Sequence, residues 1–373
     1  MISRLNYRLV FIAALLAALG TVEVARELRP SFLRPGLHLF AYVGNTADGT
    51  LTAVDLVKLA PAATIPVGPE PSGVRAHPTR KEIWGVSSAG GYAWVLDVTT
   101  NQVVAHIPVG TAPFALDFSP DGVRAYVAAS GSGTVVAIDC ATRQVVARGK
   151  AGRHPGIARV SPDGKLVLVS NRGDATLSVL DARTLATSNV VPVAPDPEQI
   201  AVLPDGLKAF VTSATHNEIS VVDLVRKALL TNLDLGGTPG DLVLKPDGGE
   251  LYVPSSATHG MLVVNTQTNE AGDFLLLGMS PGRITLNTDG DTLYVSDSGT
   301  DHVVPVAIAT RQVSTAIPVG QRPGAGQFTP MGDMLVVVDS VSSDLAVIRP
   351  KTASLLTLIP VGSRPRDLAI KMY

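Results

Sequence analysis

Hydrophobic and polar positions alternate in short runs along this chain, and the runs recur at a fixed interval. Apolar stretches such as 114–118 end at polar turn residues, and no sustained helical period appears within the repeats. A marker that begins as Ile65-Pro66-Val67-Gly68 returns every 42 residues, starting at Ile107, Gly149, Val191, Leu233, Leu275, Ile317 and Ile359. The pattern predicts a repeat protein built from short strands.

A proline occupies the same place in every copy of the unit, and a glycine lies three residues before it in all copies except the one with Ala194. The prolines are Pro71, Pro113, Pro155, Pro197, Pro239, Pro281, Pro323 and Pro365. Proline donates no backbone hydrogen bond and suits a connection or the first residue of a strand, whereas glycine tolerates positive φ or close approach. The G-x-x-P pattern therefore predicts the crossover from one sheet to the next.

Three further strands follow the first strand of each unit. A segment such as Ser119-Pro120-Asp121-Gly122 has the residues of a tight turn, and the next strand carries an aromatic residue followed by valine, as in Tyr126-Val127. A third strand ends in aspartate in five copies, at Asp55, Asp97, Asp139, Asp181 and Asp223. We expect these carboxylates to bind the following turn rather than a metal ion, because they lie in separate units and are replaced in later copies.

Four short strands in a unit of this length are typical of a β-propeller. The chain from His38 starts with strands two to four of a unit, and residues 359–373 supply only the link and strand one. The sequence thus predicts one all-β propeller over 38–373, with eight four-stranded blades and seven as the alternative. The last strand, 366–371, is expected to complete the blade begun at Phe40, which leaves no unpaired edge in the ring.

The succession G-x-x-P, S-P-D-G, Y-V and T-V-x-V-I-D, as in Ile107 to Ala147, resembles the YVTN-repeat family of β-propellers. The resemblance covers the chain after Leu37. It implies a propeller of the secreted, periplasmic or cell-surface kind and says little about activity, because members include binding modules. That family usually has seven blades. Eight-bladed relatives include the heme d1-binding domain of cytochrome cd1 nitrite reductases, so the resemblance also allows a cofactor in the channel.

The N-terminus differs from the repeats. Arg4 and Arg8 precede an apolar run of 11 residues from Leu9 to Leu19, which is short beside the roughly 20 residues that span a bilayer. We interpret residues 1–20 as a signal peptide cleaved after Gly20, with an uncleaved anchor as the alternative, and residues 21–37 as a linker. The expected location is the periplasm, the cell surface or the medium.

Charge and motif content exclude several function classes. The formal net charge is −2 and no basic block stands out, so a nucleic-acid partner is not expected. The single cysteine, Cys140, cannot form an intramolecular disulfide and is expected to be a small buried residue. The P-loop, H-E-x-x-H and Cys-x-x-Cys-His patterns are absent, and the lack of Cys-x-x-Cys-His excludes covalently attached c-type heme.

The innermost strands supply candidate ligand-binding residues, because alternate side chains of these strands should face the channel. The channel candidates are Arg75, Asp117, Arg159, Asp241, Arg283 and Asp367. Two interpretations of the first three stay open: an ion-pair chain that fills the channel mouth, or a site where two guanidiniums bind a carboxylate or phosphate. The three aspartates are expected to lie far apart around the ring and to form no metal cage.

The crossover loops supply a second group of candidates. They are Arg153, His154, Arg322, Arg364 and Arg366. These residues are either solvated loop charges or part of a binding face. His216, His259 and His302 lie in equivalent loops without a fixed spacing, and we assign them no metal.

The sequence favours a non-enzymatic, exported and monomeric propeller that presents one face as a binding platform. Its partner would be a protein, a cell-envelope component or a small anion, and no cofactor is assigned. Contact with a membrane is expected only through an uncleaved N-terminal segment. The alternative is a channel-centred enzyme or cofactor carrier, either a lactonase-like hydrolase or a binder of a heme d1-type tetrapyrrole.

Overall fold

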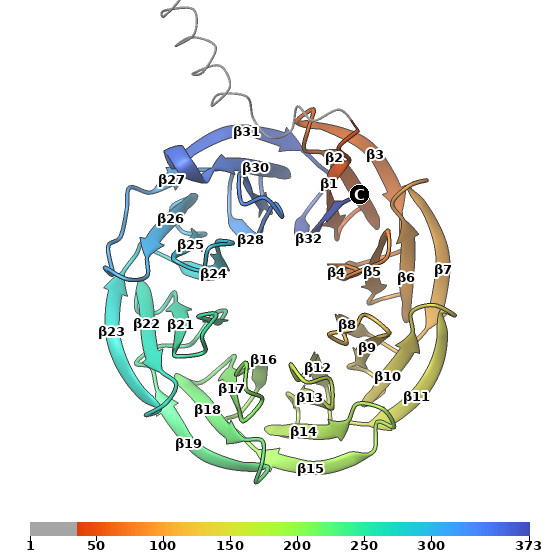
Figure 1. Cartoon of the computed structure of the whole chain (residues 1–373), viewed down its shortest axis with the longest axis vertical. Coiled ribbons are helices and arrows are strands. Elements are labelled where there is room, and N and C mark those ends of the chain that lie inside the picture. The colour runs from red at the N-terminus through yellow and green to blue at the C-terminus, as the bar shows by residue number, and fades with distance from the viewer. Residues whose placement is uncertain (1–35) are drawn as a thin grey trace, which may run out of the picture.

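Eight antiparallel sheets of four strands surround a central axis in the computed structural model, which describes residues 36–373 (Figure 1). Each sheet is one blade of a β-propeller, and its strands run outward from the axis in chain order. We number the blades from the N-terminus, so that blade 1 contains β32, β1, β2 and β3 and blade 2 contains β4 to β7. The predicted fold and the count of eight blades are confirmed.

The two inner strands of each blade carry most of the buried residues. The innermost strands, in blade order, are β32 (Pro365–Met372), β4 (Pro71–Ala76), β8 (Pro113–Phe118), β12 (Pro155–Val160), β16 (Pro197–Val202), β20 (Val243–Leu244), β24 (Pro281–Leu286) and β28 (Pro323–Phe328). The second strands are β1 (Leu39–Asn45), β5 (Glu82–Ser87), β9 (Arg124–Ala129), β13 (Leu166–Asn171), β17 (Lys208–Ser213), β21 (Glu250–Ser255), β25 (Thr292–Asp297) and β29 (Leu335–Asp339).

The two outer strands of each blade complete the sheet. The third strands are β2 (Thr50–Asp55), β6 (Tyr92–Asp97), β10 (Thr134–Asp139), β14 (Thr176–Asp181), β18 (Glu218–Asp223), β22 (Gly260–Asn265), β26 (His302–Ala307) and β30 (Asp344–Arg349). The outermost strands are β3 (Ala60–Pro66), β7 (Gln102–Pro108), β11 (Gln144–Lys150), β15 (Thr187–Pro192), β19 (Ala228–Asp234), β23 (Glu270–Leu276), β27 (Ile317–Pro318) and β31 (Ser354–Pro360). A short 3₁₀ turn, η2 (Pro350–Thr352), precedes β31.

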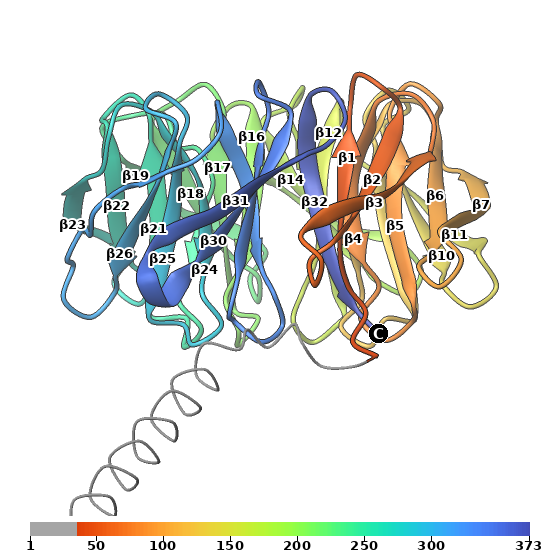
Figure 2. The same cartoon turned by 90° about the horizontal axis from the view of Figure 1, so that it is seen from above.

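The C-terminal strand closes the ring. β32 pairs antiparallel with β1, with Leu39 opposite Met372 and Gly44 opposite Asp367, and the two strands lie side by side in both views (Figures 1 and 2). Blade 1 therefore combines three N-terminal strands with one C-terminal strand, as the sequence predicts. The side chains of Leu368 and Ile370 are each only 5% exposed, because they pack between blades 1 and 8.

The hydrophobic core consists of eight clusters within residues 36–373, and each cluster joins two neighbouring blades. Alternate inner-strand residues such as Val74 and Leu116 enter these clusters, as predicted from period two. The aromatic residues of the second strands, including Trp84 and Tyr126, are buried there as well. Cys140 belongs to the cluster between blades 2 and 3, which confirms its predicted burial.

The aspartates at the ends of the third strands bind backbone groups of the turn that follows. In blade 3, Asp139 Oδ1 accepts hydrogen bonds from the amides of Ala141 at 3.0 Å and Thr142 at 2.8 Å. Asp55 and Asp223 accept the equivalent bonds in their own blades. The predicted structural role of this column is confirmed.

One of the two faces of the ring carries the crossover loops and the loops between second and third strands, and we call it the loop face (Figure 2). The two kinds of loop are joined by recurring backbone bonds, such as Arg172 N to His154 O at 3.2 Å and Thr46 N to Arg364 O at 3.1 Å. The predicted need for glycine is seen at Gly68, where φ is +104°, and at Gly278, where a Cβ would lie 1.8 Å from Asp297 Oδ2. The loop face is therefore a tightly bonded surface.

A buried pair of carboxyl groups lies at the loop face of blade 8. Asp339 occupies the position held by Asn171 in blade 4, and its Oδ2 accepts the Gly320 amide at 3.0 Å. Burial, and then the neighbouring carboxyl of Asp344, raises the pKa of Asp339 to about 9. Because two adjacent carboxylates cannot both stay charged away from water, Asp339 holds a proton at neutral pH. A hydrogen bond between the Asp339 and Asp344 side chains also acts to raise this pKa; at the equivalent place in blade 4 the Asn171 amide donates to Thr176.

The predicted signal peptide and most of the predicted linker lie outside the described residues. Within residues 36–373, the search for a helix long and apolar enough to cross a membrane finds none.

Removing the buried side chains of β32 should weaken the whole ring. We expect Leu368→Ala and Ile370→Ala each to lower the free energy of unfolding by about 2–5 kcal/mol, because each leaves a cavity between blades 1 and 8. Thermal unfolding followed by circular dichroism would measure the effect. Met372→Ala, in the same strand but 41% exposed, is the matched control and should change little. An unchanged melting temperature in the Leu368/Ile370 double variant would contradict closure by this strand.

The Asp339 proton predicts a pH dependence of stability. The pKa of Asp339 in the folded state is raised above the ordinary 3.8. The stabilisation that its proton provides is therefore complete below pH 3.8 and declines as pH rises toward about 9. The slope for one proton is about 1.4 kcal/mol per pH unit. Asp339→Asn should remove this slope, so that the variant is more stable than the wild type at pH 8 and similar to it near pH 4. Urea unfolding across this range provides the measurement.

Asp297 is the matched control, because it holds the same column position in blade 7. Burial acts against its charge, but hydrogen bonds from Thr300 and from the Ser280 and Met279 amides lower its pKa overall. A lowered pKa stabilises the fold above the unfolded pKa and is lost in acid. Asp297→Asn should therefore reduce stability at neutral pH. Parallel pH profiles for the two variants would refute the assignment of the proton to Asp339.

Candidate functional site

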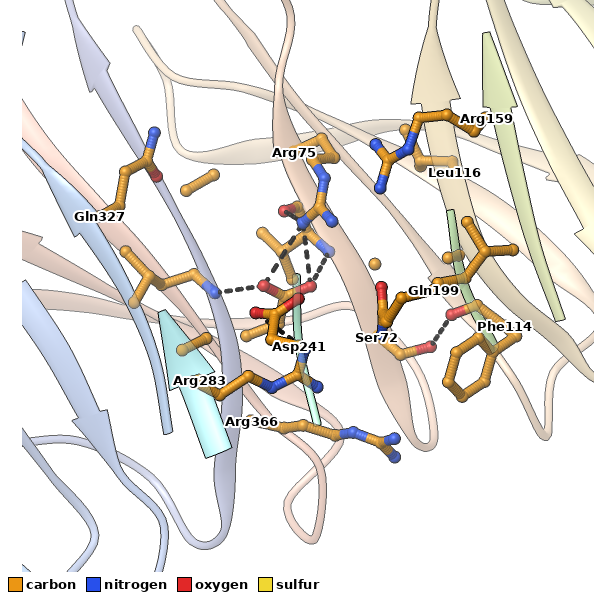
Figure 3. Close-up of a pocket in the computed structure, with 18 of the residues that line it drawn as sticks. Ser72, Arg75, Phe114, Leu116, Arg159, Gln199, Asp241, Arg283, Gln327 and Arg366 are labelled. Atoms are coloured by element: carbon orange, nitrogen blue, oxygen red, sulfur yellow. Dashed lines mark hydrogen bonds and ion pairs between the residues drawn. The ribbon is translucent and has the colours of Figure 1, made fainter. Parts of the chain in front are cut away.

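The inner strands enclose a cavity of about 420 Å³ along the propeller axis. Five of the six predicted channel residues line it: Arg75, Arg159, Asp241, Arg283 and Asp367. The sixth, Asp117, contacts the lining residue Arg159. Figure 3 shows side chains from several blades directed toward the middle of this cavity. The sequence candidates on the inner strands are therefore brought together around one space.

Three arginine–aspartate pairs join neighbouring blades across the wall of the cavity. Arg75 Nη1 lies 3.1 Å from Asp367 Oδ2, between blades 2 and 1. Arg159 pairs with Asp117 at 3.5 Å, between blades 4 and 3. Arg283 pairs with Asp241 at 3.5 Å, between blades 7 and 6. In each pair the aspartate belongs to the preceding blade, so the charges form separate bridges around the ring.

Two of these aspartates also bind the backbone of the next blade. Asp367 Oδ2 accepts the Val74 amide and Asp117 Oδ2 accepts the Val160 amide, both at 3.1 Å. Gln327 occupies in blade 8 the position that Asp117 has in blade 3, and its Oε1 accepts the Ile370 amide at 3.0 Å. All three side chains therefore hold adjacent inner strands together, and the two aspartates also compensate arginines.

Carboxylates from several blades act electrostatically on Arg75 across the cavity. The carboxylate of Asp367, with smaller contributions from Asp117 and Asp241, holds the pKa of Arg75 above its ordinary value, although burial acts in the opposite direction. The three aspartates, expected far apart, thus all act on one guanidinium while each pairs with a different arginine. Within residues 36–373 no cluster of His, Cys, Asp or Glu side chains is arranged to hold a metal ion.

The mouth of the cavity on the loop face combines the predicted Arg366 with three residues that the sequence did not single out, Phe114, Arg172 and Glu198. The guanidiniums of Arg172 and Arg366 lie 5.2 and 5.4 Å from the ring centre of Phe114, within range of a cation–π contact. Arg172 also pairs with Glu198 at 2.6 Å. Arg366 is exposed and forms no ion pair within residues 36–373. The four side chains span blades 1, 3, 4 and 5.

A bulge explains why period two missed Phe114 and Glu198. The pairing of β8 with β9 shifts between Pro113 and Ala115, and equivalent shifts occur in most inner strands. An extra residue in one strand of a pair turns a side chain away from strict alternation. The residue that follows the proline of a unit therefore lines the cavity where it is not glycine. A comparison of this position across the eight units would have identified Phe114 and Glu198.

Blade 6 interrupts the regular wall. Its inner strand β20 has only two residues, and the segment before it leans toward blade 7, where Asp241 N donates to Gly282 O at 3.0 Å. A second cavity of about 240 Å³ adjoins this segment and shares Glu198, Gln199, Asp241 and Arg283 with the channel. The channel is thus polar and asymmetric on the side of blades 5 to 7.

The remaining sequence candidates lie on the loop face outside the cavity. Arg153 pairs with Asp174, and His154 follows it in the crossover loop of blade 4. Arg364 lines a shallow pocket beside blade 1, and Arg322 lies in the crossover loop before β28. The structure places only Arg366 of this group at the channel. His216, His259 and His302 bond to groups of their own or the adjoining crossover loop, through Thr215, Met279 and Thr300.

Part of the chain matches a known family model. Residues 86–234, less than half of the chain, match the model of the Cytochrome D1 heme domain family. A comparison with curated protein sequences finds no match. The match supports the predicted propeller with repeated blades, whereas the narrower resemblance to the YVTN-repeat family stays a prediction.

Three solved structures show the same fold at low identity. Dihydro-heme d1 dehydrogenase NirN in complex with DHE has a TM-score of 0.77 at 18% identity, over 91% of this chain and 76% of that chain. Apo AztD from Citrobacter koseri has a TM-score of 0.67 at 12% identity, over 90% and 98%. Kuenenia stuttgartiensis hydrazine synthase has a TM-score of 0.60 at 19% identity, over 75% and 95%. At these identities the likeness concerns the fold alone.

The close contact between blades 2 and 3 at the cavity predicts a sensitive position. Gly73 lines the cavity at φ +59°, and a Cβ there would lie 2.9 Å from Ala115 Cα. Gly73→Ala should lower the free energy of unfolding by about 1–3 kcal/mol through backbone strain, with a further cost from the clash. Gly282→Ala is the matched control, because a Cβ there meets no atom within 4 Å. Equal urea midpoints for the two variants would contradict this contact.

Proposed function

We propose that this protein is a non-catalytic binding module whose channel takes up a planar, carboxylate-bearing ligand of the tetrapyrrole class. The observation that carries the proposal is the convergence of four guanidiniums, from Arg75, Arg159, Arg283 and Arg366, on one cavity. Guanidinium groups bind carboxylates through paired, charge-assisted hydrogen bonds. The match to the Cytochrome D1 heme domain supports the choice of ligand class.

The residues of the cavity fit the acidic periphery of such a ligand and do not fit a heme iron. Heme side chains end in carboxylates, for which the arginines are suitable partners, and Phe114 offers an aromatic ring at the mouth. The axial ligands of heme iron are His, Cys, Met or Tyr side chains, and the cavity lining contains none of these residue types. The proposed function therefore concerns binding and assigns no chemistry to iron.

The arginine–aspartate bridges define the state of the channel before a ligand enters. The arginine side chains of these bridges are 33–47% exposed, so each pair contributes only about 0–1 kcal/mol. Displacing an aspartate therefore costs little beside the charge-assisted hydrogen bonds that a ligand carboxylate forms with the arginine. A ligand with several carboxylates gains from engaging several arginines at once, which is the basis of the proposed selectivity.

Other parts of the sequence interpretation stay predictions. Export, a monomeric state and a protein or cell-envelope partner at the loop face are compatible with this binding role. Arg364 and Arg322 remain the candidate contacts for such a partner, because neither forms an ion pair within residues 36–373.

Loss of two channel arginines should weaken ligand binding strongly. We expect Arg75→Ala with Arg159→Ala to weaken binding of protoporphyrin IX about 100-fold or more, since each charge-assisted hydrogen bond contributes about 1.5–3 kcal/mol. Tryptophan-fluorescence quenching on titration would give the dissociation constant. Arg183→Ala with Arg226→Ala, on exposed turns, is the matched control. Full retention of binding by the channel variant would falsify the site, and no binding of protoporphyrin IX or heme d1 to the wild type would overturn the proposed function.

Substitution of the aspartates that pair with these arginines distinguishes ligand binding from general disruption of the channel. Asp117→Asn with Asp367→Asn retains an oxygen for the Val160 and Val74 amides but removes the charges that compete for Arg159 and Arg75. Binding should become about tenfold tighter, because the arginines are free for ligand carboxylates. Weaker binding by this variant would indicate that the aspartates serve the ligand directly.

A further inference from the structure

We propose that the channel recognises a tetrapyrrole through its carboxylates alone and supplies no axial ligand to its metal, so that it binds metal-free and iron-containing forms equally well. This inference rests on the proposed function and specifies its ligand class. It departs from the usual expectation for a heme-binding domain, in which a side chain of the domain holds the iron.

All seven histidines and the single cysteine of the chain fall within the described residues, so each can be placed. His216 and His259 occupy loops between second and third strands, and His302 is the first residue of β26. His38 stacks on Tyr373 at ring closure, and His106 lies in the outermost strand β7. Cys140 is buried between blades, and burial raises the pKa of its thiol to about 12. None of these residues lines the channel.

His77 directly follows the inner strand β4, and both of its ring nitrogens are already bonded. Nδ1 accepts the amides of Thr79 at 3.2 Å and Arg80 at 2.9 Å. Nε2 therefore carries the proton and donates to Gly122 O at 2.9 Å. The side chain is 1% exposed. A histidine held in this way has no nitrogen lone pair left for a metal.

His154 is the histidine of the crossover loops and the remaining candidate for a ligand. A Cβ on Gly173 would lie 2.9 Å from His154 Cδ2, so the ring packs over the loop of its own blade. Its backbone carbonyl accepts the Arg172 amide at 3.2 Å, which fixes the loop. His154 does not line the cavity, although its neighbour in space, Arg172, contacts Phe114 at the mouth.

The lining side chains that remain are arginines, carboxylates, Gln199, Gln327 and apolar or small residues. Arginine is always protonated and cannot donate a lone pair. The carboxylates of Asp241 and Asp367 are held by arginines, and Glu198 is held by Arg172. Recognition therefore depends on the ligand's negative groups, and the lining side chains would supply no axial ligand to a metal in the ring.

The test compares metal-free protoporphyrin IX with its Fe(III) form on the full chain. We expect dissociation constants that agree within about threefold, and loss of binding for the dimethyl ester of either form, because the carboxylates carry the affinity. Imidazole titrated into the Fe(III) complex should shift the Soret band without releasing the macrocycle. His154→Ala should leave all three measurements unchanged.

The outcomes separate this inference from the proposed function. A preference of about tenfold or more for the Fe(III) form overturns the inference and leaves channel binding intact. A low-spin, six-coordinate spectrum before imidazole is added does the same, above all if His154→Ala or His77→Ala removes it. If neither form binds and heme d1 also fails, the proposed function is wrong and the inference falls with it.

Discussion

The pairing of β1 with β32 is the interaction on which the rest of this structure depends. Each blade buries its two faces against its neighbours, so an open ring would leave two apolar faces in water. The pairing joins the ends of the chain and removes the free edge that an incomplete blade would present. The same strand carries Asp367 and Arg366 into the channel, so closure of the ring and construction of the candidate site are a single event.

Charge compensation lowers the cost of placing Arg75, Arg159 and Arg283 in one channel. Isolated charges in a confined space are costly unless they are paired and hydrogen-bonded. Asp367 and Asp117 meet this need twice, since each accepts a guanidinium and a backbone amide of the next blade. The carboxylates thus serve the fold, and the partly exposed guanidiniums serve as exchangeable contacts. Such a division of roles allows a ligand to enter without dismantling the contacts between blades.

The sequence predicted what the repeat determines and missed what departs from the repeat. The regular spacing of Pro71 and its equivalents determined blade number, crossovers and closure, because each copy must bury the same face. The pairing of Arg75 with Asp367 joins residues 292 positions apart and becomes visible only when the ring is closed. Phe114 and Glu198 were missed because a bulge breaks the alternation, and the shortened β20 reflects a local contact between Asp241 and Gly282 that no periodic pattern encodes.

The pairing of charges in the channel supports the proposed binding role. A general base needs a lone pair directed at a substrate proton, and a nucleophile needs a neighbouring base to activate it. The carboxylates of Asp367 and Asp241 instead face the guanidiniums of Arg75 and Arg283. Ring symmetry also distributes the arginines over separate blades, which suits a ligand with carboxylates around its periphery better than one with a single reactive group. A broad, planar polyanion matches both properties, and this match connects the architecture to the proposed ligand class.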